Sequence, residues 1–571
     1  MHLSRSLLLL ATGLFAATQT AHGQAYKLRL VAQTGDVAPG SFGGHFTWLG
    51  WPTLNASGQV AFAAGSDGPI ADSGLWRSVF DNPQACELII GQDYPVPGSP
   101  PEVRFDAFDP SFHHPLLNDD GNVGFSARLT TLAYPGTGLF RMVNGSIQRV
   151  AVPGDVVPGS GGTLTYESVS NLPAFNESNS LAFAADLAGP GVTPDNDNAY
   201  FAHWFGGVQM FLREGNAVPG LPGSTFSLGS LVHPTLESTG AISFAAVIKG
   251  ASPRPWSLWR GWPAAMSPLA IAGDPTPIGG QLVGNAGVID FWPISPGIGT
   301  YAFASNVLLP IATLEGAWGV SDSVLDDYAV EAHPGPLGTY ASIQSFAPMV
   351  AADGTAVYWA SFNGGSDETD SAIIRQPLGG VATIMVREGD PAEGFGPGVV
   401  FDELAAWWAS TPIINDAHQI VLNAYVRGPG IGNDNDRGLW VIDANGTLNT
   451  ILREGQFLSL KGETPRQVQD WVVTSGISEH GGRRPGINAR GDVAIVIWFT
   501  DGTDAVVVAQ RPDPCAADLN DDGVVDAQDL GIMLGAWGST GPVGTGGDID
   551  WDGDTDGADL AVLLGAWGMC G

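Results

Sequence analysis

One phrase decides the fold of this chain, Pro52-Thr53-Leu54-Asn55-Ala56-Ser57-Gly58-Gln59-Val60-Ala61-Phe62. Asn hydrogen-bonds the local backbone and Gly accepts a positive φ, so Asn55 to Gly58 predicts a tight turn. The run that begins at Val60 is apolar at successive positions. It predicts a strand covered on both faces, as in a sheet stacked between neighbouring sheets.

The same phrase recurs along most of the chain. Its proline returns at Pro115, Pro173, Pro234, Pro293, Pro348, Pro412 and Pro485. Ten residues after these prolines stand large apolar side chains: Phe125, Phe183, Phe244, Phe303, Tyr358, Leu422 and Ile495. A period of about 60 residues, kept eight times, indicates a repeat architecture.

Each unit continues with further strand and turn signals. A Gly-Leu-aromatic step recurs, followed by an apolar run and a Gly-Asp or Glu-Gly turn. Three or four short strands per unit match the size of a propeller blade. We therefore expect an all-β, eight-bladed β-propeller-like domain over residues 24–510; an open solenoid is the alternative.

The two ends of the repeat region predict closure of the ring. Residues 26–31 look like the last strand of a unit whose earlier strands are missing. The unit containing residues 493–497 and 505–508 lacks a last strand. Joining them would complete one blade and remove two exposed strand edges.

Composition and targeting signals limit the partners and the location. A net charge of −35 argues against nucleic acid or an anionic membrane surface as partner. Residues 1–23 read as a secretory signal peptide, with Arg5, an apolar run from Leu7, and a small-residue cleavage site ending at Gly23. We expect export to the extracellular space or cell surface and no transmembrane segment.

The C-terminal residues 511–571 have a different character, with acidic loops in place of apolar strands. Oxygen ligands fall at positions 1, 3, 5, 9 and 12 of a twelve-residue loop, with Gly523 at position 6 for the sharp turn and a backbone carbonyl at position 7. The first set is Asp518, Asn520, Asp522, Val524, Asp526 and Asp529; the second is Asp548, Asp550, Asp552, Asp554, Asp556 and Asp559. Hard oxygen ligands on a flexible loop predict two Ca²⁺ ions.

Each loop is followed by an apolar helix, and neither is preceded by one. The expected helices begin at Leu530 and Leu560, while proline and glycine fill the approaches to both loops. Of the three cysteines, Cys515 and Cys570 bracket the module, and we expect them to form a disulfide. Cys86 is expected to remain an inert thiol.

This pair of loops with exit helices and Asp at position 12 is similar to type I dockerins. The terminal cysteines and the twin Leu-Gly-Ala-Trp-Gly endings resemble the variant found on exported bacterial proteins. The resemblance implies calcium-dependent folding and docking to a cohesin-like receptor. The usual Ser/Thr recognition pair is replaced by Ala527-Gln528 and Gly557-Ala558, so the resemblance does not identify the receptor.

The repeat region resembles secreted bacterial proteins with tandem N-x-x-G-x-x-x-A-F repeats, and this resemblance implies no established activity. Zinc-protease, P-loop, Rossmann and nucleophile-elbow motifs do not occur in a convincing context. Two Asp-Asn-Asp loops, at 195–197 and 434–436, can be turns or a further cation site. Arg-Glu-Gly at 213–215, 387–389 and 453–455 can be structural or catalytic, and His113, His114, His233 and His333 are ambiguous.

Three functions remain open from the sequence. The leading hypothesis is a secreted binding or scaffold propeller, anchored through the calcium module and able to take a glycan ligand. The first alternative is a glycoside hydrolase for polysaccharide breakdown, whose paired carboxylates would meet across the propeller. The second is a structural component of the cell surface.

Overall fold

The structure is a computed structural model. It describes residues 26–68, 72–79, 82–108, 114–130, 136–204, 206–228, 234–250, 256–263, 265–283, 300–310, 312–321, 324–343, 348–366, 369–404, 411–460, 463–474, 486–511, 515–520, 523–539, 547–549 and 554–569. The expected signal peptide lies outside these residues.

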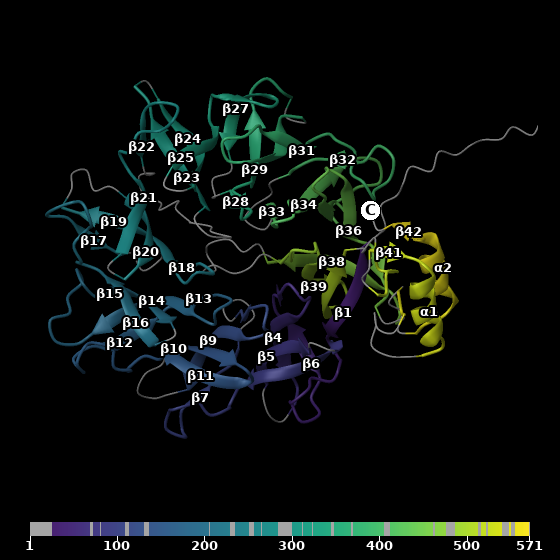
Figure 1. The fold of residues 1–571 in the computed structure, drawn as a ribbon, viewed down its shortest axis with the longest axis horizontal. Helices are drawn as coiled ribbons and strands as arrows, with labels where there is room; N and C mark the ends of the chain where they lie inside the picture. The colour runs from purple at the N-terminus through teal and green to yellow at the C-terminus, as the bar shows by residue number, and fades with distance from the viewer. Residues whose placement is uncertain are drawn as a thin grey trace, which may run out of the picture.

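Eight antiparallel sheets of four to six strands are found in the described residues, and Figure 1 shows them arranged as the blades of a ring. Blade 1 comprises β2 (Phe46–Leu49), β3 (Thr53–Leu54), β4 (Val60–Ser66), β5 (Ser73–Val79) and β6 (Asn82–Gly91). Blade 2 comprises β7 (Arg104–Phe105), β8 (Leu116–Leu117), β9 (Val123–Thr130), β10 (Gly136–Val143) and β11 (Ser146–Ala151). Blade 3 comprises β12 (Thr165–Val169), β13 (Ala174–Phe175), β14 (Leu181–Ala188), β15 (Asn198–Trp204) and β16 (Gly207–Arg213).

Blades 4 to 6 continue the ring. Blade 4 comprises β17 (Thr225–Ser227), β18 (Thr235–Leu236), β19 (Ile242–Lys249), β20 (Trp256–Trp262) and β21 (Ala265–Ile271). Blade 5 comprises β22 (Gln281–Val283), β23 (Thr300–Leu308), β24 (Thr313–Ser321) and β25 (Val324–Val330). Blade 6 comprises β26 (Pro334–Gly335), β27 (Gly338–Ile343), β28 (Met349–Val350), β29 (Ala356–Phe362), β30 (Ser371–Gln376) and β31 (Thr383–Arg387).

Blades 7 and 8 complete it. Blade 7 comprises β32 (Val400–Phe401), β33 (Ile413–Ile414), β34 (Ile420–Arg427), β35 (Arg437–Ile442) and β36 (Leu448–Arg453). Blade 8 comprises β37 (Phe457–Leu458), β38 (Arg466–Val473), β39 (Val493–Phe499), β40 (Asp504–Gln510) and, from the other end of the chain, β1 (Lys27–Gln33). The expected eight-bladed propeller is confirmed.

The ring closes as expected, through the N-terminal strand. β1 pairs antiparallel with β40, from Lys27 opposite Gln510 to Gln33 opposite Ala505. Arg29 on β1 is buried, and its guanidinium donates to the carbonyl of Gly58 in blade 1 at 2.8 Å. This continuous pairing rules out the open solenoid, since such a fold would leave β40 as an edge.

The phrase that decides the fold forms the turn between a short strand and the following long strand. In blade 1, β3 pairs with the start of β4, and the Asn55 side chain accepts from the Gln59 amide at 2.8 Å. Gly58 has a φ of +83°, a conformation that side chains other than Gly rarely adopt. β4 is buried along its whole length, as its apolar composition predicts.

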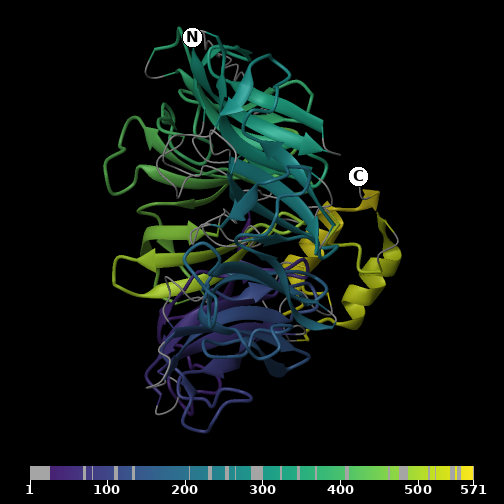
Figure 2. The ribbon, with the colours of Figure 1, turned by 90° about the vertical axis from the view of Figure 1, so that its left-hand side faces the viewer.

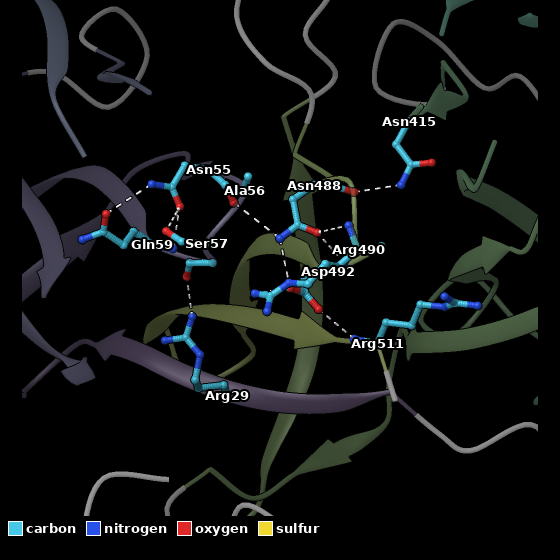
Figure 3. A network of polar contacts seen from close by, with 12 residues as sticks. Arg29, Asn55, Ala56, Ser57, Gln59, Asn415, Asn488, Arg490, Asp492 and Arg511 are labelled. Atoms are coloured by element: carbon cyan, nitrogen blue, oxygen red, sulfur yellow. Dashed lines mark hydrogen bonds and ion pairs between the residues drawn. The ribbon is translucent and has the colours of Figure 1, made fainter. Parts of the chain in front are cut away.

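The same asparagine also links one blade to the next. The amide nitrogen of Asn55 donates to the carbonyl of Asn118 at 3.0 Å. Further links of this kind run from Asn176 to Glu237, from Asn415 to Asn488, and from Asn488 to Asn55. Figure 3 shows Asn415, Asn488 and Asn55 in this chain of contacts. The asparagine that predicts the turn therefore also hydrogen-bonds neighbouring blades to each other around the ring. We call these bonds between blades the asparagine latch.

Edge-to-face aromatic pairs fill the blades. In blade 1, Phe46 on β2 meets Trp76 on β5, with ring centroids 5.2 Å apart and planes at 78°. Equivalent pairs are Phe105–Phe140, Tyr166–Phe201, Phe226–Trp259 and Phe401–Trp440. Each such pair adds about 0.5–1.5 kcal/mol to what area burial contributes. Much of the aromatic content is therefore core.

The C-terminal module contains β41 (Val524–Val525), α1 (Ala527–Gly535), α2 (Gly557–Gly565) and β42 (Gly568–Met569). β41 and β42 pair antiparallel, and a small core of Ala517, Val525, Met533, Ile549 and Leu563 holds the two helices together. Figure 1 places the module outside the ring beside β1, and Figure 2 shows its two helices from the side. Among the described residues, no helix is both long and apolar enough to cross a membrane.

Candidate functional site

The two helices of the C-terminal module begin in the same way, at the ends of the expected calcium loops. Asp526 caps α1 by accepting from the Gln528 amide at 2.7 Å, and Asp556 caps α2 by accepting from the Ala558 amide at 2.7 Å. Each helix therefore starts three residues before the apolar run from which it is expected, because the loop residue at position 9 is also the N-cap.

The carboxylate at position 12 ties the start of each loop to its helix. Asp529 is fully buried and accepts from the amides of Leu519 and Asp526 at 2.7 and 2.8 Å. Asp559, also fully buried, accepts from Ile549 and Asp556 at 2.6 and 2.8 Å. Burial raises the pKa of Asp529, but these backbone donors outweigh it and hold the pKa below its usual value.

The second loop brings its acidic side chains together. One carboxylate oxygen each from Asp554, Asp556 and Asp559 lies within 4.8 Å of the others. Among the described residues, this is the one group of three acidic, histidine or cysteine side chains close enough to share a metal ion. Three converging carboxylates are donors that suit Ca²⁺.

The first loop is described less completely. Asp518 accepts from the Gly523 amide at 2.7 Å, and Gly523 has a φ of +86°, as the sharp turn at position 6 requires. Val524 lies in β41 opposite Met569. Asp522, Asp550, Asp552 and Cys570 lie outside the described residues, so the complete ligand sets and the Cys515–Cys570 disulfide stay predictions.

Both helices expose large apolar side chains at matching positions. Leu534 and Trp537 follow the first loop, and Leu564 and Trp567 stand at the same places after the second. Their exposed fractions are 54% and 47% in each pair. The two helices thus present the same pair of apolar side chains to solvent at equivalent positions.

The Asp-Asn-Asp loops of blades 3 and 7 are organised by their central asparagines. The Asn196 side chain accepts from Thr193 at 2.9 Å and donates to Gly191, while Asn435 accepts from Gly432 at 2.7 Å and donates to Gly430. Both asparagines thus stabilise the loop in which they lie. This geometry favours the turn interpretation over a cation site.

In the Arg-Glu-Gly repeats, the arginines bond to loop groups, Glu214 contacts the next blade, and Glu388 bonds within its own blade. Arg213, Arg387 and Arg453 donate to Asn196, Thr369 and Gly394. Glu214 contacts Ser227 and Lys249, and Glu388 accepts from Ser371 at 3.0 Å. These two glutamates are buried and paired, which supports a structural role for them.

Glu454, the third of these glutamates, has a different environment. Burial and the neighbouring carboxylate of Asp436 raise the pKa of Glu454 to about 7, against the opposing effect of Arg437. Its Oε2 atom is buried without a hydrogen-bond partner. Arg437 instead donates to Asp470 of blade 8 at 2.7 Å. Both phrases that contribute to this acidic cluster, residues 434–436 and 453–455, could be singled out in the sequence. Their spacing along the chain does not show that Asp436 and Glu454 lie side by side.

The histidines expected as ambiguous ligands are not gathered into one site in the described part of the chain. His114 stacks on Trp51, with ring centroids 5.0 Å apart. His333 lies near Asp327 in blade 5. His113 and His233 lie outside the described residues, and the Cys86 thiol donates to the carbonyl of Val31 at 3.5 Å.

Comparison with known proteins gives a match of part of the chain to one family and several solved structures with some likeness. Residues 12–81 and 321–518, less than half of the chain, match a family described as a family of unknown function (DUF7453). No relative was found among curated proteins.

Solved structures with some likeness include an oligogalacturonate lyase in complex with manganese, at 12% identity and a TM-score of 0.36, covering 74% of this chain and 96% of that one. They also include the Dos1 propeller, at 8% identity and a TM-score of 0.37, covering 84% and 95%. The polysaccharide lyase Uly1 has 9% identity and a TM-score of 0.31, covering 73% and 94%. At such low identities and scores, these likenesses carry no conclusion about activity.

Proposed function

We propose that this chain is an exported protein whose eight-bladed propeller binds or organises an extracellular ligand, and whose C-terminal module anchors it in a calcium-dependent way. The observation that carries the proposal is the repeated loop-and-helix geometry around Asp529 and Asp559. Each buried carboxylate ties the start of its loop to the helix that follows, in the same way in both loops.

Calcium binding would stabilise the folded C-terminal module as well as neutralise the acidic charge of its loops. The module has eleven Asp and no Lys or Arg among residues 515–571, so its loops repel themselves without a cation. Its described core is small, which makes ion binding the main source of stability. The calcium-loaded module would present Leu534, Trp537, Leu564 and Trp567 to a cohesin-like receptor.

The decisive experiment is limited proteolysis of the full chain with and without calcium, read by mass spectrometry. With calcium, we expect both the propeller and the module to resist cleavage. With a chelator, cleavage should appear within residues 515–571 while the propeller stays intact, and Mg²⁺ should restore little protection. Identical cleavage in all conditions would contradict the proposal.

A polysaccharide hydrolase is the second candidate, and the cluster of Glu454, Asp436 and Asp470 favours it. Two carboxyl groups whose environments separate their pKa values can act as general acid and base. Polysaccharide digests with the native chain and with Glu454→Gln would test it. Release of sugar that the substitution abolishes would support catalysis. A chain that neither hydrolyses nor binds glycans would favour a structural component of the cell surface.

A further inference from the structure

Blades 3 and 4 carry two neighbouring tryptophans at the edge of the core: Trp204 is half-buried against it, and Trp262 is exposed. Trp204 ends β15, and Trp262 ends β20 in the next blade. Their ring centroids lie 6.2 Å apart with planes inclined by 34°. Trp262 is 41% exposed. Two neighbouring indoles therefore form a shallow, bent aromatic surface at the junction of two blades.

The two tryptophans depart from the residue types found at the equivalent position of the other blades. In every blade a buried side chain stands opposite the large apolar residue of the preceding long strand, as Trp259 stands opposite Phe244. The third residue after that position is Val79, Val143, Trp204, Trp262, Ser321, Pro377, Asp443 and Gln510 in blades 1 to 8. Tryptophan occupies the position only in the two blades where the rings meet, so the fold does not demand it there.

The turn between β18 and β19 fixes the orientation of the rings. The indole nitrogen of Trp204 donates to the carbonyl of Gly240 at 3.0 Å. A Cβ at Gly240 would lie 2.9 Å from Trp262, so the glycine leaves room for that ring against the turn. Preorganised aromatic side chains lose little conformational freedom when a ligand binds.

The acidic side chain of the turn beside the rings, Glu237, has its charge compensated. Glu237 is fully buried and receives both a bidentate contact from Arg260, at 2.6 and 2.7 Å, and a hydrogen bond from Tyr301. Ser238 and Thr239, next in the chain, are exposed. The Thr239 hydroxyl donates to Glu237 at 3.0 Å, so the surface combines aromatic faces with the hydroxyl of Ser238.

We propose that Trp204 and Trp262 form a stacking platform for a neutral polysaccharide. The faces of indole rings attract the polarised C–H groups of a sugar ring, and neighbouring hydroxyls can bond to sugar hydroxyls. An acidic glycan is disfavoured because the chain carries a net charge of −35. The inference rests on the proposed binding role of the propeller and assigns that role a site and a ligand class.

The test is affinity electrophoresis of the full chain, with calcium, in gels containing mixed-linkage β-glucan, galactomannan or xylan, with polygalacturonate as the anionic comparison. We expect retardation by at least one neutral polymer and none by polygalacturonate. Trp262→Ala should weaken that binding at least about tenfold, and Trp262→Phe should weaken it less. Phe457→Ala, which removes an aromatic side chain that is 70% exposed in blade 8, is the matched control and should bind normally.

Thermal unfolding of Trp262→Ala separates lost binding from lost fold, because a half-exposed side chain should affect stability little. Chelation of calcium should leave glycan binding unchanged, since the platform lies in blades 3 and 4. Failure of calcium-dependent anchoring and failure of the platform are thus distinguishable. No binding to any neutral polymer, preference for polygalacturonate, or normal binding by Trp262→Ala would overturn the platform.

Discussion

Leu30, close to the start of the described chain, lies directly opposite Val507 on the last strand of the propeller. Both side chains are buried, at 6% and 0% exposure, in the core shared by blades 7 and 8. The two ends of the repeat region are thus joined by a complete strand ladder and by packing.

Leu30→Ala should destabilise the whole ring. Truncation of a buried leucine costs about 2–5 kcal/mol, and here the cavity would form where the ring closes. Urea unfolding followed by tryptophan fluorescence would measure it. Val37→Ala, a truncation at a site that is 62% exposed just after β1, should change the free energy of unfolding little. Equal changes in the free energy of unfolding for the two substitutions would contradict a stabilising role for the β1–β40 contact.

The asparagine latch gives a second prediction. Asn488 donates to the carbonyl of Asn55 and to Asp492, and its own side-chain oxygen accepts from the Asp492 amide at 3.0 Å. Asn488→Ala would leave buried backbone groups without partners, at a cost of about 1–3 kcal/mol. Thermal unfolding would report the loss. Asn433→Ala, on an exposed loop, provides the control and should unfold like the native chain.

Glu454 should make stability depend on pH. The unfolded carboxyl has a pKa near 4.5, whereas burial and Asp436 raise the folded pKa to about 7. Between these values the folded state retains a proton that the unfolded state has released. The contribution of Glu454 is therefore fully present below pH 4.5 and is lost as the pH rises through about 7.

Glu454→Gln should flatten this dependence. Because the side chain is partly exposed, we expect a gain of only about 1 kcal/mol over the native chain at pH 8, and almost none at pH 5. Chemical denaturation at several pH values would measure it. Glu403→Gln changes an exposed carboxylate and should leave the slope unaltered. Parallel pH profiles for native chain and Glu454→Gln would contradict the assignment.

Calcium binding by the first loop should be sensitive to even a conservative replacement of Asp529. Asp529→Asn keeps the size of the side chain but replaces one of two accepting oxygens with a donor, facing either Leu519 or Asp526. We expect calcium affinity of the first loop to fall at least about tenfold, because the loop geometry and the charge are lost together. Calorimetric titration would detect it. Asp120→Asn, in a turn of blade 2, serves as control and should not alter calcium binding.

The periodic part of the structure could be predicted from sequence. Each Asn-Gly turn is a local device, and each following apolar strand must be covered, so the number of blades and the closing strand at residues 26–31 followed from counting. β1 spans Lys27–Gln33 in the structure, so it begins one residue later and ends two residues later than expected. The helices were also predictable, although the capping role of Asp526 and Asp556 places their starts earlier.

The contacts between blades could not be predicted in the same way. Asn55 signals a turn in sequence, but its bond to Asn118 depends on how two blades are rotated against each other. Glu454 and Asp470 come together only because the end of blade 7 lies beside β38 of blade 8. Trp204 and Trp262 could have been singled out as exceptions within the repeat, whereas their mutual distance could not.

The closing strand has a mechanical consequence. β40 leads directly into the segment that carries the C-terminal module, and it is hydrogen-bonded to β39 on one side and β1 on the other. Tension applied through a tethered module therefore enters the ring at an interior strand. Two ladders must rupture together before the chain can be pulled out, so a protein anchored through this module, as proposed, should withstand flow or drag.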